Sequence, residues 1–144
     1  MSYAIVKYLH FIGIFGLFSL LLLEVYIVRP VLSGALLTRL ANVDLIYWAS
    51  GVLVLITGLM LTFSVGKPAS FFLSNPVYHT KVALFGILIL VTFYPTFFFQ
   101  SHRRCRAEPE VKVPPAVITI IRIKLLMLSL LPLLGVLMAL GYGH

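Results

Sequence analysis

The sequence contains few charged residues and almost no cysteine. Only 10% of its 144 residues are charged, four of them acidic, and the longest polar stretch, residues 100–114, is one loop long. We therefore expect no soluble domain. The single cysteine, Cys105, cannot form an internal disulfide, and we interpret it as a reduced cytoplasmic thiol. The sequence also lacks a Walker loop, HExxH, CxxC and any Ser-His-Asp pattern, so hydrolase chemistry has no support.

Apolar residues dominate instead. They make up 61% of the chain, and the mean hydropathy is +1.10, outside the range of soluble globular proteins. Four apolar runs occupy approximately residues 3–28, 41–65, 77–99 and 116–140. Each run is long enough for a transmembrane helix, which needs about 20 apolar residues to cross a hydrocarbon core of ~30 Å. The connections are short, and short connections favour antiparallel neighbours. We predict one all-α domain over residues 1–144, an integral membrane four-helix bundle with up-down-up-down topology.

Lysines and arginines are distributed unevenly between the two sides of this bundle. Three lie on the side of the termini and the second connection: Lys7, Lys67 and Lys81. The other eight lie in or beside the first and third connections: Arg29, Arg39, Arg103, Arg104, Arg106, Lys112, Arg122 and Lys124. The positive-inside rule places the eight in the cytoplasm, next to anionic lipid. We predict a bacterial inner-membrane protein with both termini periplasmic or extracellular. The net charge of +7 then indicates contact with the lipid bilayer and not nucleic-acid binding.

Ionisable residues inside the apolar runs indicate where function lies, because each costs several kcal/mol at that depth. In the first run, His10, Gly13 and Glu24 share one helical face, which we expect to point into the bundle. Gly13 and Gly16 allow close approach by a helix or a flat ligand. In the alternative without function, His10 only bonds to a carbonyl or hydroxyl group of a neighbouring helix. On the cytoplasmic side, Arg122 is the expected partner of Glu24.

The third run begins with His79 and Lys81. His10 lies about 10 Å and His79 about 5 Å below the outer ends of their helices, at 1.5 Å per residue. Two histidines at similar depth can bind a heme iron from both sides. His79 and Lys81 point about 200° apart, so only one faces the core, and Lys81 is the alternative ligand or a partner of a heme propionate. Without such a role, both residues occupy a wet interface. Further aromatic residues suggest interfacial belts: Tyr47, Trp48, Tyr94 and residues 97–99.

Two resemblances add to these patterns. The first is carried by these stretches: Tyr8-Leu9-His10-Phe11, Val43-Asp44-Leu45, Thr57-Gly58-Leu59, Asn75-Pro76-Val77 and Tyr94-Pro95-Thr96. Through them nearly the whole chain resembles an uncharacterised family of small bacterial four-helix membrane proteins. More distantly, Leu9-His10 and Lys81 are similar to HemJ-type protoporphyrinogen oxidases, which implies heme b at His10 and Lys81. The HemJ signature at the fourth helix is not reproduced, since the chain reads Arg122-Ile123-Lys124-Leu125.

We interpret the chain as a heme b-binding membrane protein with a redox or electron-transfer role, with the heme toward the outer leaflet. The expected cofactor-binding residues are His10, His79, Lys81, Gly13 and Arg122, with the iron ligands His10 and His79, or alternatively Lys81. A quinone or another redox partner would exchange electrons with it, and the enzymatic version is a HemJ-like oxidoreductase. Two alternatives carry no cofactor. One is a transporter or proton relay through His10, Glu24 and Lys81, which needs a homodimer, and the other is an assembly scaffold.

The charge asymmetry yields a topology prediction. A reporter that is active only in the cytoplasm should be inactive when fused after His144, because the C-terminus lies on the side with three cationic residues. The same reporter inserted between Arg104 and Lys112 should be active. Strong activity of the C-terminal fusion would reverse the proposed orientation.

Overall fold

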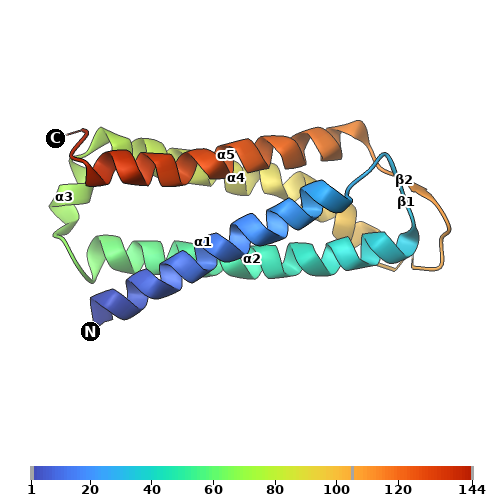
Figure 1. Ribbon diagram of the computed structural model, residues 1–144, viewed down its shortest axis with the longest axis horizontal. Coiled ribbons are helices and arrows are strands. Elements are labelled where there is room, and N and C mark those ends of the chain that lie inside the picture. Colours follow the sequence, from blue (N-terminus) through green and yellow to red (C-terminus); the bar gives the residue numbers. More distant parts are fainter. Residues whose placement is uncertain (1, 105, 144) are drawn as a thin grey trace.

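The computed structural model describes residues 2–104 and 106–143, so Cys105 and His144 lie outside the described residues. The described chain is a bundle of four long antiparallel helices (Figure 1): α1 (Ser2–Ile27), α2 (Gly34–Phe63), α4 (Pro76–Ser101) and α5 (Pro115–Ala139). All four are long and apolar enough to span a membrane. The predicted all-α, up-down-up-down architecture is confirmed.

Short elements absent from the sequence prediction close the two ends of the bundle. At one end, β1 (Val31–Leu32) pairs antiparallel with β2 (Val111–Lys112), which ties the first connection to the third. At the other end, α3 (Ala69–Leu73) fills the second connection beside both termini (Figure 1). We call the half of the bundle with β1 and β2 the strand half, and the half with the termini the terminal half.

Local signals explain where two of the long helices, α2 and α4, begin. The Ser33 side chain accepts a hydrogen bond from the Leu36 amide and caps α2 at Gly34, seven residues before the predicted start at residue 41. Asn75 caps α4 in the same way by accepting from the Val77 amide, and Pro76 occupies the first turn, where a missing N–H is tolerated. The early start of α2 brings residues 34–40 into the bundle.

The helices pack as two hairpins placed side by side. α1 packs mainly on α2 and also contacts α5, whereas α4 packs mainly on α5 and also contacts α2. Helices α1 and α4 therefore lie diagonally across the bundle. Figure 1 shows α1 crossing α2 obliquely. Side chains from all four helices can thus meet in the interior.

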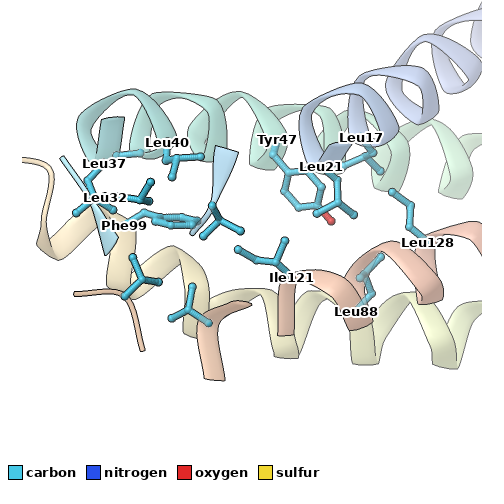
Figure 2. Packing of buried hydrophobic residues seen from close by; sticks show 14 of the residues in the cluster. Leu17, Leu21, Leu32, Leu37, Leu40, Tyr47, Leu88, Phe99, Ile121 and Leu128 are labelled. Atoms are coloured by element: carbon cyan, nitrogen blue, oxygen red, sulfur yellow. The ribbon is translucent and has the colours of Figure 1, made fainter. Parts of the chain in front are cut away.

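Most buried apolar side chains lie in the strand half and in the middle of the bundle (Figure 2). The fully or almost fully buried members include Leu17, Leu21, Leu37, Leu40, Phe99, Val117, Ile121 and Leu128. Tyr47 reaches from α2 into this cluster, and only 4% of its surface is exposed. The prediction of an interfacial belt was wrong for Tyr47 and Phe99, because both rings complete the core instead.

The glycines of the first helix allow α1 and α2 to approach closely. A Cβ atom at Gly13 would lie 2.7 Å from Val54 Cγ2, and one at Gly16 would lie 2.6 Å from Ser50 Oγ. The predicted inward orientation of the His10–Glu24 face is confirmed, since Gly13, Leu17 and Glu24 on it are buried. The space beside Gly13 is filled by α2, however, and leaves no room for a flat ligand there.

This contact predicts that Gly13→Leu destabilises the fold. The added side chain would collide with α2, and overpacking of a tight contact costs about 1–3 kcal/mol. The matched control is Phe15→Leu, since Phe15 is 64% exposed toward the surrounding lipid. Thermal melting of the purified protein in detergent should show a clear loss for the first variant and almost none for the second. Equal melting temperatures would contradict the packing described.

Candidate functional site

His10 forms a side-chain hydrogen bond to α2 in the terminal half. Its Nδ1 lies 2.8 Å from the Thr57 hydroxyl of α2. That hydroxyl already donates to the Leu53 carbonyl at 2.6 Å, with the Val54 carbonyl at 3.2 Å. Because a hydroxyl group has one hydrogen, Nδ1 must carry the proton and donate it to Thr57. The neutral imidazole then has its lone pair on Nε2.

Lys81 projects from α4 into the same half of the bundle. It is half-buried, it acts electrostatically on His10, and no hydrogen bond or ion pair involves it among the described residues. Small residues lie beside both groups. A Cβ atom added to Gly58 would lie 3.4 Å from the His10 ring, and a Cβ atom added to Gly135 would lie 3.7 Å from Lys81 Nζ. Each of the two groups therefore has a glycine beside it in the terminal half, and we call this part of the bundle the His10–Lys81 region.

His79 lies outside this region. Its side chain is exposed, and Nε2 is 2.7 Å from the carbonyl oxygen of Leu73, the last residue of α3. The predicted pairing of His10 with His79 is therefore not formed. The sequence left open whether His79 or Lys81 faces the core. The two side chains point about 200° apart on α4, and Lys81 is the one on the side of His10.

A second group of ionisable side chains lies in the strand half. Lys124 Nζ is 3.6 Å from Glu24 Oε2, and both side chains are 0% exposed. The same ammonium group lies 4.2 Å from the centroid of the Tyr47 ring, in a cation–π contact. The prediction that Arg122 pairs with Glu24 was wrong. Lys124 lies on the buried face of α5. Arg122 is two positions earlier, about 200° around the helix, and is therefore exposed.

Arg122 is also remote from the His10–Lys81 region. Lys81 packs near Gly135 on α5, and thirteen residues of helix separate Gly135 from Arg122, or about 20 Å along the axis. The expected role of Arg122 at a cofactor in the terminal half therefore has no geometric basis.

Asp44 completes the buried charges from α2. Its Oδ1 accepts a hydrogen bond from Thr96 at 3.1 Å, and the Thr96 hydroxyl in turn accepts from Trp48 Nε1 at 2.7 Å. Asp44 is 0% exposed and acts electrostatically on both Glu24 and Lys124. We call Glu24, Asp44, Tyr47 and Lys124 the charged cluster. Sequence reasoning turned Glu24 into the bundle but treated most of the other charges as interfacial, so it missed the cluster.

The two groups are well separated. His10 and Glu24 are fourteen residues apart on α1, which places them about 20 Å apart along its axis. Leu17 lies midway, and around it a pocket of about 160 Å³ opens between α1, α2 and α4, with a lining that is almost entirely apolar. The described residues contain no group of three or more His, Cys, Asp or Glu side chains that could hold a metal ion.

Comparison with known proteins identifies the family of the chain. Residues 2–143 match the model of the family described as "Predicted membrane protein (DUF2214)", and the chain belongs to that family. It is therefore a membrane protein, in agreement with its four apolar helices. No curated protein and no solved structure matches the chain significantly. The family description assigns no activity, so the likeness to HemJ-type enzymes stays a prediction.

The buried ion pair predicts different effects of mutating the two neighbouring cations of α5. Lys124→Ala should lower the free energy of unfolding by about 3 kcal/mol, because it leaves buried carboxylates without a counter-charge. Arg122→Ala should change it little, because Arg122 is exposed. Thermal or denaturant unfolding in detergent measures both. A larger loss for Arg122→Ala would mean that α5 is rotated relative to the structure.

Proposed function

We propose that this member of the DUF2214 family binds heme b in the terminal half of its bundle, with His10 and Lys81 as the axial ligands, and that it has a redox or electron-transfer role. The observation that carries the proposal is the hydrogen bond from His10 Nδ1 to Thr57. It leaves the other ring nitrogen as a lone-pair donor inside the membrane, which is the usual form of a metal-bound histidine.

Thr57 acts as the positioning group for His10. Metal-binding histidines usually donate their second N–H to an oxygen acceptor, and this contact fixes both the tautomer and the ring orientation. Thr57 meets the requirement because its own hydrogen is directed at the α2 backbone. The same bond to a hydroxyl group of a neighbouring helix is also what the alternative without function predicts, so the absorption spectrum decides between the two.

Lys81 and the nearby glycines support the same proposal from α4 and α5. The lysine nitrogen has no carboxylate partner among the described residues, unlike the nitrogen of Lys124. Gly58 and Gly135 place no side chain beside the His10 ring and Lys81 Nζ. A heme b held there supplies a one-electron carrier, and the surrounding apolar helices exclude water from it.

We also propose that the terminal half faces the outer leaflet of a bacterial inner membrane, with both termini outside the cytoplasm. The asymmetry of eight cationic residues against three supports this orientation. In that orientation the redox site is close to the outer surface, where a quinol or another small redox partner exchanges electrons with it.

The absorption spectrum of the protein purified from cells supplied with heme tests the proposal. The wild type should be red, with the Soret and α bands of a low-spin, six-coordinate heme b. His10→Ala should lose heme or leave it high-spin, and Lys81→Ala should likewise leave it high-spin, because each removes one axial ligand. His79→Ala is the matched control and should leave the spectrum unchanged, since His79 is exposed and bonds to Leu73.

Two outcomes would contradict this assignment. A folded wild-type protein that takes up no heme during expression or reconstitution would remove the redox function. A spectrum that changes in His79→Ala and not in Lys81→Ala would assign the second ligand to His79, which requires a rotation of α4.

A further inference from the structure

The charged cluster contains polar atoms that the described residues do not satisfy. Four buried atoms have no hydrogen-bond partner: Glu24 Oε1, Glu24 Oε2, Asp44 Oδ2 and Lys124 Nζ. The Lys124–Glu24 separation of 3.6 Å is an ion-pair contact and is longer than a hydrogen bond. Three of the four atoms are carboxylate oxygens, which can only accept hydrogen bonds. The fourth, Lys124 Nζ, carries N–H donors that reach none of them, so the hydrogen bonding of the cluster is incomplete.

The charges of the cluster also do not balance. Two carboxylates and one ammonium group leave one negative charge if all three are ionised, at positions that are 0% exposed. A net charge buried among apolar helices in a membrane is strongly unfavourable. Two carboxylates that share one site do not both ionise readily, because each charge disfavours the other.

We propose that Glu24 and Asp44 together hold one exchangeable proton, which makes the charged cluster a proton-binding site inside the membrane. The two carboxyl groups act electrostatically on each other inside one cluster, and each has an oxygen without a hydrogen-bond partner. A proton on one of them donates to an oxygen of the other, so one O–H group satisfies acceptors on both residues. The cluster then contains one carboxylic acid, one carboxylate and one ammonium group, and its net charge is zero.

The neighbouring side chains favour a proton over a metal cation. Lys124 already occupies the centre of the cluster as a fixed positive charge and would repel a second cation. Two carboxylates are also few for a sodium or potassium ion, which needs several oxygen ligands, and the described residues contain no third His, Cys, Asp or Glu side chain there. A proton needs only the two oxygens between which it is shared.

All four helices contribute to the surroundings of the shared proton. The titratable groups are Glu24 from α1, Asp44 and Tyr47 from α2, and Lys124 from α5. Helix α4 contributes the hydroxyl of Thr96, while its nearby Tyr94 is 48% exposed. The proton balance of the cluster therefore involves two acids and one amine, with the Tyr47 ring as a neutral neighbour.

A row of polar groups leads from the cluster toward the strand end, where water is available. Thr96 bonds to Asp44, and one turn later the Gln100 amide donates to the Ala41 carbonyl at 2.9 Å. Gln100 Oε1 accepts from Arg103 Nη1 at 3.0 Å, next to Asn42 at the surface. We infer that water which exchanges the proton enters along this row, because the pocket on the other side of the cluster, around Leu17, has an almost entirely apolar lining.

Infrared spectroscopy tests the proton directly and does not depend on heme binding. The folded wild type at neutral pH should show one C=O stretching band of a protonated carboxylic acid, and the band should shift in D₂O. Glu24→Gln and Asp44→Asn should each abolish it, because the remaining acid pairs as a carboxylate with Lys124. Glu110→Gln is the matched control and should keep the band, since Glu110 lies exposed in a loop.

Lys124→Met provides the opposite change. Methionine is similar in length to lysine and carries no charge, so both carboxyl groups should become protonated and the band area should rise about twofold. Circular dichroism verifies that each variant retains its helices.

Gln100→Leu should slow the shift of the wild-type band in D₂O without removing it, if the polar row is the route of exchange.

Three results would overturn the proposal. The first is a folded wild type without a protonated carboxyl band. The second is a band that persists in both Glu24→Gln and Asp44→Asn, which would assign it elsewhere. The third is a band that disappears when choline chloride is replaced by sodium chloride, which would make the ligand a metal cation. A colourless protein that still shows the band would remove the heme proposal and leave this one intact.

Discussion

The inability of lipid to solvate a charge is the constraint on which the structure depends. Glu24, Asp44 and Lys124 have no aqueous neighbour at their depth, so each must face protein. This requirement fixes the rotation of three helices at once: α1 turns Glu24 inward, α2 turns Asp44 inward, and α5 turns Lys124 inward. The apolar contacts of Leu21, Ile121 and their neighbours then form around the resulting geometry.

The sequence determined the helices and the inward face of α1 because both follow from simple periodic patterns. Runs of apolar residues mark the spans, and His10, Gly13 and Glu24 recur at helical spacing. The choice between Arg122 and Lys124 depends on the rotation of α5, which no span prediction defines. A signal was nevertheless present: Lys124 lies three residues after Ile121 and four before Leu128, both buried, so it shares their face. Arg122 does not.

The parts of the fold that sequence reasoning missed depend on contacts between distant segments. Strands β1 and β2 are two residues long and exist only because the first and third connections meet at one end of the bundle. The orientation of His79 is likewise decided outside its own helix, by the carbonyl of Leu73 at the end of α3. No periodicity within residues 77–99 contains that information. Side-chain direction near a helix end therefore remained open between His79 and Lys81.

The separation of the two sites sets how strongly they influence each other. They lie about 20 Å apart along α1, so no hydrogen bond or direct contact joins them. Two unit charges at that distance interact by about 0.8 kcal/mol at an effective dielectric constant of ~20, and by more where water is excluded. A negative charge added near His10 and Lys81 would thus raise the proton affinity of Glu24 and Asp44 about fourfold. By reciprocity, the proton would stabilise that negative charge equally. The residues around Leu17 therefore keep the two sites from direct contact, while the charges of the sites still act on each other.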